Sequence, residues 1–450
     1  MVARKFALAN AKSAIRKRRN IRMVHGTNDL RAAYRRVPTK QMQFTCVAVW
    51  DSDAKKVVYC ELPGHNFGLK SAVVNFNRFP ELAAVAARRL AWVPTEHYYD
   101  DNDTAEPSYA KGSGQACLKE LCGTGFFGFP YDPQKDEDCD TSNEYLGVTT
   151  DFSRMSDGFV SMTISDKRRK KLRDLINEIA ASKQLASGIA GSLYGKARFA
   201  ISPCFGCVGR ACLQPLMERE YDRLNKHITE ELQDSLEFLR LMCDTMPPVK
   251  LPLTPPTLDP VIIFTDAEGK QRDGATPPSG HLGFVVYHPV YGKRYAHAPA
   301  PREWAELFDR IKQRKTYIGQ YELAAAITPF LSLPTEWFRD RPVELWIDNS
   351  GAIGGLIGGY SGKPDCARLI NLFHFAVAKL GIRSLWIDYV ASESNPADIP
   401  SRLHEMSREE AKAEVADLGD LMAMTLPRFA KKDGTWRSYT EIARSVWNSR

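Results

Sequence analysis

Two adjacent carboxylates stand in the segment His97–Asp103, which reads HYYDDND. Asp100 and Asp101 repel each other when both are ionised, so a fold that holds them together needs water or a divalent cation to offset the repulsion. A third carboxylate, Asp29, opens the segment DLRAAYRRV. Taken singly, Asp29 is best interpreted as a helix N-cap. Two-metal phosphoryl transfer needs acids from separate segments that converge on ions about 4 Å apart, and these three acids fit that need.

A second set of acids lies in the C-terminal half of the chain. One acid ends the strand-like run VIIFTD, one begins the helix-like run QYELAAAI, one ends VELWID and one lies in SNPADIPSR; they are Asp266, Glu322, Asp348 and Asp398. Acids at strand ends and on a helix face, brought to one edge of a mixed sheet, form a site for two hard cations, Mg²⁺ or Mn²⁺. Individually, Asp348 could cap a helix and Asp398 could sit in a turn.

One further acid and two histidines of this half could also take part in chemistry. Asp388, in the middle of the strand-like run LWIDYV, is an alternative fourth acid, but its position within a strand favours Asp398 instead. His297 and His374 are interpreted as structural residues.

The elements that must position these acids are separated by one clear boundary. Residues 245–260 contain six prolines in sixteen residues, which predicts an extended linker. Before it, the pattern predicts a hairpin of residues 44–50 and 57–62, then helices over residues 171–179 and 218–242. After it, strands are expected at residues 261–264, 282–287 and 293–297. Then come a helix at 321–331, a strand at 343–347, a helix at 367–380 and a strand at 384–389. That order predicts an α/β layer with mixed strand pairing.

Composition and charge narrow the class of protein. The 450 residues include 44% hydrophobic and 26% charged residues, as in soluble globular proteins of two to four domains. The apolar runs are too short to cross a bilayer, so no membrane partner is expected. Ten irregularly spaced cysteines indicate thiols rather than a disulfide framework. Eight Lys or Arg residues precede Asp29, and Lys167–Lys171 is entirely basic. Such clusters favour nucleic acid as the partner, bound mainly through its backbone.

Several motifs in the first 150 residues together resemble the palm of a reverse transcriptase. They are Asp29 with Leu30 and Tyr34, the segment Phe67–Ala72, the YxDD-like box Tyr98–Asp101, the segment Pro133–Lys135 and the segment Glu144–Gly147. The segments 192–200 and 209–216 are similar to the helical connection of tyrosine-recombinase-type retroelements.

This resemblance implies roles for individual residues. Asp29 and Asp100 would hold two magnesium ions with support from Asp101, and Tyr34 would exclude a 2′-hydroxyl. The remaining contacts to nucleotide and template would come from Phe67, Gly68, Lys70 and Lys135. Two departures are notable. Only 28 residues precede Asp29, where the family carries a fingers subdomain, so the polymerase half is expected to be incomplete. The run Asn102–Pro107 is also unusually polar for the return strand of a hairpin.

The second set of acids resembles that of ribonuclease H, and NPADIPSR is similar to the closing motif of retroelement ribonuclease H domains. The resemblance implies cleavage of the RNA strand of an RNA–DNA hybrid. The expected fold class is multidomain α/β and α+β. The expected divisions are a basic segment (1–28), a palm with an antiparallel sheet and helices (29–160), a helical connection (161–244), a linker (245–257), a ribonuclease H-like mixed sheet with helices (258–403) and a charged helical tail (404–450).

Three functions are compatible with these patterns. The leading interpretation is a retrotransposon-derived RNA-directed DNA polymerase with a ribonuclease H domain, bound to template–primer and hybrid. The alternative is a relic of a retroelement that binds nucleic acid without catalysis. A third, a general metal-dependent nuclease or transposase, would leave the motifs of the first 150 residues unexplained and predicts cleavage of DNA.

Overall fold

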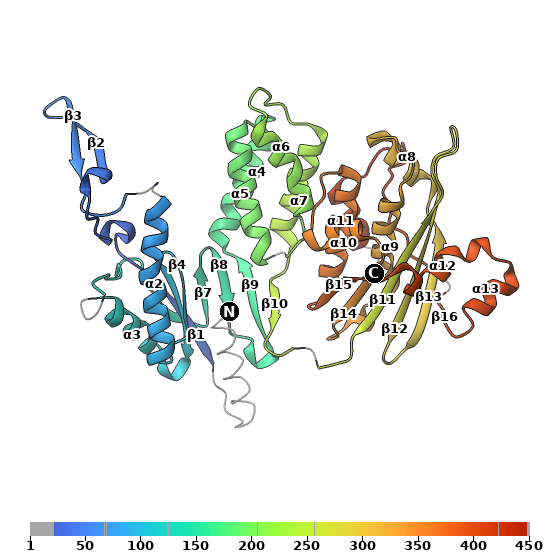
Figure 1. The fold of residues 1–450 in the computed structure, drawn as a ribbon, viewed down its shortest axis with the longest axis horizontal. Helices are drawn as coiled ribbons and strands as arrows, with labels where there is room; N and C mark the ends of the chain where they lie inside the picture. The colour runs from blue at the N-terminus through green and yellow to red at the C-terminus, as the bar shows by residue number, and fades with distance from the viewer. Residues whose placement is uncertain are drawn as a thin grey trace. The chain divides into compact units, whose positions relative to one another are not determined.

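The computed structural model describes residues 22–66, 68, 70–123, 127–204, 206–255, 257–421 and 423–447. The basic run Arg16–Arg19 and Phe67 lie outside the described residues. The chain forms two compact units, an N-terminal unit of residues 1–165 and 249–254 and a C-terminal unit of residues 166–248 and 255–450. Both units combine helices with sheets, so the mixed α/β class expected from the sequence is confirmed (Figure 1). Among the described helices, none is both long and apolar enough to span a membrane.

The first sheet of the N-terminal unit is fully antiparallel. Its strands, in spatial order, are β4 (Thr95–Tyr98), β5 (Asp101–Pro107), β1 (Met23–Asp29) and β6 (Glu137–Asp140). Helix α2 (Lys70–Leu90) packs against α3 (Ser113–Cys122), and both contact the sheet. Their apolar faces meet in a core that includes Phe76 and Leu118, both fully buried. Burial of these apolar helix faces against the sheet holds β1 and β5 in place. Asp29, at the end of β1, and Asp101, at the start of β5, are therefore held at the same end of the sheet.

The N-terminal unit also contains a second antiparallel sheet and a hairpin. The sheet consists, in spatial order, of β10 (Val249–Pro252), β9 (Phe159–Ile164), β8 (Val148–Asp151) and β7 (Ser142–Tyr145). The proline-rich segment thus supplies an edge strand, where a missing backbone N–H is tolerated. Strands β2 (Cys46–Asp51) and β3 (Lys56–Glu61) form the predicted hairpin, which extends away from the rest of this unit (Figure 1).

A six-stranded mixed sheet organises the C-terminal unit. Its strands, in spatial order, are β15 (Leu385–Tyr389), β14 (Val343–Ile347), β11 (Val261–Gly269), β12 (Gly280–His288), β13 (Gly292–Pro299) and β16 (Gly419–Asp420). Strands β11, β12 and β13 pair antiparallel, whereas β14 pairs parallel with both β11 and β15. Each of the five strands predicted for this sheet is present, and the mixed pairing is confirmed.

Helices cover this sheet. Helix α9 (Ile318–Ser332) packs on β11 and β12 and against α11 (Pro364–Lys379), while the short helix α12 (Asp398–Arg402) contacts β12, β11 and β13. Gly283 on β12 permits this close approach, because a Cβ at that position would collide with the backbone of Ser401. Gly283 pairs with Asp266, so α12 lies on the face of the sheet to which the Asp266 side chain points.

The remaining described elements are short or helical. In the N-terminal unit they are the 3₁₀ turns η1 (Ala33–Arg36), η2 (Met42–Thr45), η3 (Ser108–Ala110) and η4 (Met155–Asp157). In the C-terminal unit they are the helices α4 (Asp166–Ser182), α5 (Ser187–Cys204), α6 (Gln214–Tyr221), α7 (Glu230–Thr245), α8 (Arg302–Ile311), α10 (Ser350–Gly358), α13 (Arg408–Glu414) and α14 (Tyr439–Trp447), with η5 (Ala211–Leu213), η6 (Thr335–Phe338), η7 (Ser392–Ser394) and η8 (Leu403–Glu405).

Two local expectations from the sequence are corrected. The helix predicted over residues 218–242 is two helices, α6 and α7, because the Asp222 carboxylate accepts hydrogen bonds from the next turn and Thr229 caps the N-terminus of α7. Strand β11 does not end at Asp266. Its ladder with β12 continues to the pair Gly269–Gly280, which gives Glu268 a place on the sheet.

The segment after Leu403 contributes to the packing of the C-terminal unit. Strand β16 pairs with β13, and α14 packs on both α7 and α11. Phe429, Ile442 and Ala443 are buried there. Besides the charged helix α13, this segment therefore carries a strand and, in α14, a share of the apolar core.

A buried ion pair joins α7, α11 and the start of α14. Arg368 donates to the Asp234 carboxylate, which also accepts from the backbone N–H of Tyr439 at 2.6 Å. The Arg368 guanidinium lies 4.7 Å from the centre of the Tyr439 ring. Removal of the carboxylate alone would leave a buried cation without its partner, and such changes typically cost about 3–5 kcal/mol.

We therefore expect Asp234→Ala to destabilise the C-terminal unit by about 3–5 kcal/mol. Thermal unfolding of the full chain, followed by calorimetry, measures the change. Glu237→Ala, an exposed acid on the same helix, is the matched control and should shift the transition little. Equal shifts for both variants would contradict a specific role for the pair.

Candidate functional site

Three carboxylates of the C-terminal unit converge on one point. Asp266, Glu322 and Asp348 each offer an oxygen atom, and these atoms lie within 4.8 Å of one another. Asp266 comes from β11 and Asp348 follows β14 directly; because these strands are parallel neighbours, with Thr265 opposite Ile347, the two acids meet at the same edge. Glu322 reaches the same point from α9. Three of the four acids predicted from the sequence are therefore brought together.

Burial sets the electrostatics of this group. Asp266 and Glu322 are each only 4% exposed. Burial raises the pKa of Asp266 to about 6, with smaller contributions from Asp348 and Asp398. Burial also raises the pKa of Glu322 well above its usual value, and the neighbouring carboxylates add to that shift. Each shift has the same physical cause, since a buried negative charge beside other negative charges is unfavourable.

The donor set fits a hard divalent cation. Oxygen Oε2 of Glu322 is buried and has no hydrogen-bond partner within the described part of the chain. A buried polar atom without a partner is costly, and an ion bound among the three carboxylates would satisfy it. Carboxylate oxygens are the ligands that Mg²⁺ and Mn²⁺ prefer. Asp266, Glu322 and Asp348 could therefore bind a divalent cation, which would offset the repulsion among their negative charges.

Hydroxyl groups orient two of the three acids. The Ser401 Oγ donates a hydrogen bond to Asp266, and the Ser392 Oγ donates to Asp348 at 2.8 Å. The Asn395 amide donates to the backbone carbonyl of Thr265 at 3.1 Å and so fixes the intervening turn on β11. Ser392, Asn395 and Ser401 were not predicted from the sequence, although Asn395 and Ser401 both lie within the NPADIPSR segment.

Asp398 and Asp388 lie outside the group of three. The Asp398 carboxylate forms an ion pair with Arg402 at 2.8 Å, yet it is close enough to contribute to the raised pKa of Asp266. Asp388 accepts hydrogen bonds from the Trp386 indole and from the backbone of Tyr389. Of the two alternatives for a fourth acid, Asp398 is thus the one with an electrostatic link to the site.

The N-terminal unit brings together its own three acids. Tyr98 pairs with Asp101, so Tyr99 and Asp100 form a two-residue turn between β4 and β5, in which Tyr99 has a φ of 55°. Asp101 lies opposite Asp29 in the ladder of β5 with β1. The carbonyl of Asp100 accepts a hydrogen bond from the backbone N–H that follows Asp29, at 2.7 Å. The HYYDDND segment is therefore a hairpin turn held against the end of β1.

A lysine balances part of this charge. The Lys135 ammonium donates to both carboxylate oxygens of Asp29, at 2.9 and 3.0 Å. Burial raises the pKa of Asp101 to about 6, assisted by a hydrogen bond with Asp29 and by the charges of Asp100 and Asp29. Burial and Asp29 also raise the pKa of Asp100. Lys135 thus occupies acceptor positions on both oxygens of Asp29.

A cavity of about 170 Å³ adjoins these acids. Its lining includes Asp29, Asp101, Lys135 and the segment Glu144–Gly147, which come from four of the five motifs named in the sequence. Tyr34 is half-buried with its ring edge-on to Phe76, 4.9 Å between centres, and the charge of Asp100 contributes to its raised pKa after burial.

Two further predicted contacts lie at the start of α2. Gly68 has a φ of 93°, a conformation that favours glycine, and Lys70 is the exposed first residue of the helix. The structure does not place either residue in the cavity lining.

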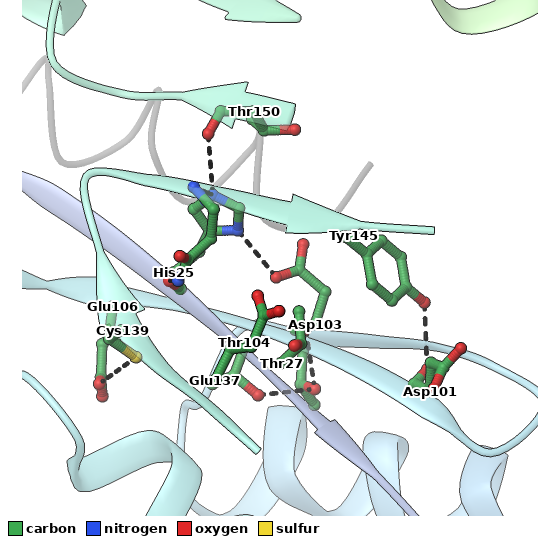
Figure 2. A network of polar contacts seen from close by, with 12 residues as sticks. His25, Thr27, Asp101, Asp103, Thr104, Glu106, Glu137, Cys139, Tyr145 and Thr150 are labelled. Atoms are coloured by element: carbon green, nitrogen blue, oxygen red, sulfur yellow. Dashed lines mark hydrogen bonds and ion pairs between the residues drawn. The ribbon is translucent and has the colours of Figure 1, made fainter. Parts of the chain in front are cut away.

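Strand β5 is unusually polar because its polar residues form hydrogen bonds within the N-terminal unit. Asp103 bonds the His25 ring at 3.0 Å, and the other ring nitrogen of His25 contacts the Thr150 carbonyl at 2.9 Å (Figure 2). Burial lowers the pKa of His25, but Asp103 outweighs burial and the pKa is raised overall. The Tyr145 hydroxyl donates to the carbonyl of Asp101 at 3.1 Å. These hydrogen bonds connect β1 and β5 of the first sheet to β8 and β7 of the second sheet.

Comparison with known proteins gives a distant likeness. The sequence matches no protein-family model, and it matches no curated protein. Matching solved structures include a foamy viral protease–reverse transcriptase with double-stranded DNA, at 14% identity and a TM-score of 0.39, covering 82% of this chain and 56% of that one. Another is a foamy viral protease–reverse transcriptase with an RNA/DNA hybrid, at 10% identity and a TM-score of 0.38, covering 84% of this chain and 66% of that one. The chain thus spans less than two thirds of either protein.

The raised pKa of Asp266 predicts that the stability of the metal-free protein falls as pH rises. Because the folded-state pKa of about 6 exceeds the ordinary value of 3.8, ionisation of Asp266 destabilises the metal-free fold as pH rises from about 4 through 6. We expect Asp266→Asn to raise the melting temperature at pH 7.5 in EDTA. The gain should shrink at pH 4.5, where the wild-type carboxyl is mostly protonated.

Calorimetry at both pH values measures this effect, with Asp388→Asn as the matched control. Addition of Mg²⁺ should stabilise the wild-type protein more than Asp266→Asn. If Asp266→Asn melted at a lower temperature than the wild-type protein in EDTA at pH 7.5, the ionised Asp266 carboxylate would not be destabilising, which would contradict the raised pKa.

Proposed function

We propose that the C-terminal unit is a divalent-cation-dependent nuclease of the ribonuclease H type, which cleaves the RNA strand of an RNA–DNA hybrid. The observation that carries the proposal is the convergence of Asp266, Glu322 and Asp348 at one edge of a mixed sheet, with a buried Glu322 oxygen that has no partner within the described part of the chain. The likeness of NPADIPSR to the closing motif of retroelement ribonuclease H domains supports the choice of substrate.

The residues of the site have distinct roles in this proposal. Asp266, Glu322 and Asp348 hold the cations, which when bound neutralise charge on the phosphate and activate water. Ser401 and Ser392 fix the orientation of Asp266 and Asp348, so the acids need not reorganise when substrate binds. Because the pKa of Asp266 is about 6, its ligand form predominates above that pH, and cation binding displaces the remaining proton.

We expect Asp348→Asn and Glu322→Gln each to reduce Mg²⁺-dependent hydrolysis of a labelled RNA–DNA hybrid by about 10²–10³-fold or more, as for other groups that stabilise developing charge. Ser401→Ala should reduce the rate about 10–100-fold through loss of orientation of Asp266. Asp388→Asn is the matched control and should cleave at nearly the wild-type rate.

The same assay separates the competing functions. Cleavage of double-stranded DNA at a rate equal to that of hybrid would favour a general nuclease instead. Hybrid binding without cleavage by the wild-type protein would favour the non-catalytic relic.

We infer nucleotidyl transfer as a second function, carried by the N-terminal unit. Asp29, Asp101 and Lys135 line one cavity, and Asp100 lies in the turn beside it, which suits two cations and a triphosphate. In this proposal Asp29 and Asp100 hold the cations with support from Asp101, and Lys135 transfers from Asp29 to the incoming phosphates. Tyr34 lies under the sugar, and Gly68 and Lys70 face the template.

Primer extension on an RNA template tests the second function. We expect Asp100→Asn to abolish extension by the full chain while hybrid hydrolysis continues, because the two sites belong to different units. Asp138→Asn, an exposed acid of β6, is the control. Absence of extension by the wild-type chain, under conditions where hybrid is cleaved, would remove this function and leave the nuclease proposal intact.

A further inference from the structure

A second group of metal-ligand side chains lies on the sheet of the C-terminal unit. Glu268, His281 and His404 each offer one ligand atom, and these atoms lie within 4.8 Å of one another. Glu268 on β11 and His281 on β12 are directly opposite each other in the ladder, so their side chains share one face of the sheet. His404 comes from η8, immediately after α12. The group therefore joins three separate segments of chain.

This group is distinct from the three carboxylates. Glu268 lies two residues beyond Asp266 on the same face of β11, which separates their Cα atoms by about 6.6 Å. None of its three members belongs to the group of Asp266, Glu322 and Asp348. Its donors are also of a different kind, with two imidazoles and one carboxylate. Imidazole nitrogen suits Zn²⁺ and related transition metals, whereas Mg²⁺ favours oxygen.

The distances are close to those of a zinc site. The His404 Nε2 lies 3.6 Å from the Glu268 Oε2. With ligand bonds of about 2.0–2.1 Å, neighbouring ligands of a tetrahedral zinc ion are about 3.4 Å apart. The His281 and His404 rings are stacked, with centres 3.5 Å apart and an angle of 6° between planes. Both lone pairs can point at one ion only if one of the two rings rotates, and the His404 side chain is 21% exposed.

The charges around the group are compatible with a bound cation. Glu405 lies 4.0 Å from His404 and also contacts Lys270 at 3.7 Å. Lys270 therefore has an acid partner of its own in Glu405.

We propose that Glu268, His281 and His404 form a zinc-class metal site that fastens the chain after α12 to the sheet. The ion takes two imidazole nitrogens and one carboxylate oxygen, and solvent completes its coordination. The site lies next to α12, which carries Ser401 and Asp398, so a bound ion holds these residues over Asp266. The proposal does not depend on the nuclease activity.

The test uses the full chain in an Asp348→Asn background, which disables the carboxylate group as a competing site. After treatment with a chelator and its removal, the protein is titrated with Co²⁺ and then with Zn²⁺. We expect one equivalent of Co²⁺ to give the visible absorption of a low-coordinate complex, which Zn²⁺ then displaces. The double variant Asp348→Asn, His404→Gln should bind Co²⁺ at least about 10-fold more weakly than Asp348→Asn alone. His227→Gln, at an exposed histidine elsewhere in the unit, is the matched control and should leave binding unchanged.

A second readout uses thermal unfolding. Zn²⁺ should raise the melting temperature of the Asp348→Asn protein, and either His404→Gln or Glu268→Gln should remove that shift while the proteins remain folded in EDTA. No binding of Co²⁺ or Zn²⁺, or equal binding with and without His404, overturns the proposal. Hybrid hydrolysis in Mg²⁺ by the His404→Gln protein with Asp348 intact is measured separately, so failure of the nuclease proposal is distinguishable from failure of this one.

Discussion

Mutual repulsion among buried carboxylates is the constraint on which the C-terminal unit depends. Two of the three acids, Asp266 and Glu322, are almost completely buried, and their surroundings raise the pKa of each. A fold gains nothing in stability from such an arrangement, because removal of a carboxylate from water is unfavourable unless a positive charge compensates. Packing elsewhere must offset the cost, and α9 supplies it through its apolar contacts with the sheet on one side and with α11 on the other.

Strand β11 determines how the polar groups are distributed. Alternate residues of a strand point to opposite faces, so Ile263, Thr265 and Ala267 face the apolar core while Asp266 and Glu268 face α12 and η8. Gly283 then lets α12 approach closely enough for Ser401 to reach Asp266. A side chain at position 283 would push α12 away, and the hydroxyl that orients the acid would be lost with it.

Much of the fold could be predicted from sequence, whereas the detail of the sites could not. The strands of the mixed sheet are short apolar runs with clear boundaries, and their order sufficed to place Asp266, Glu322 and Asp348 at one edge. The extension of β11 to Gly269 was missed because Asp266 and Glu268 are polar and look like the end of a strand. The division between α6 and α7 was missed because apolar spacing continues across the Thr229 cap. Ser392, Ser401 and His404 act through pairings 44 to 136 residues apart, and local patterns carry no signal for these.

The two acidic sites offset the same repulsion by different means. In the N-terminal unit, Lys135 supplies a positive charge to Asp29 from within the chain, and burial, with a hydrogen bond from Asp29, raises the pKa of Asp101 to about 6. In the C-terminal unit, no lysine or arginine forms an ion pair with Asp266, Glu322 or Asp348 among the described residues. In the proposed functions, a divalent cation would share Asp29 with Lys135 in the first site, whereas in the second it would displace the protons that the raised pKa values of Asp266 and Glu322 favour. The first site is therefore coupled to an anionic ligand that attracts Lys135, and the second is coupled to pH.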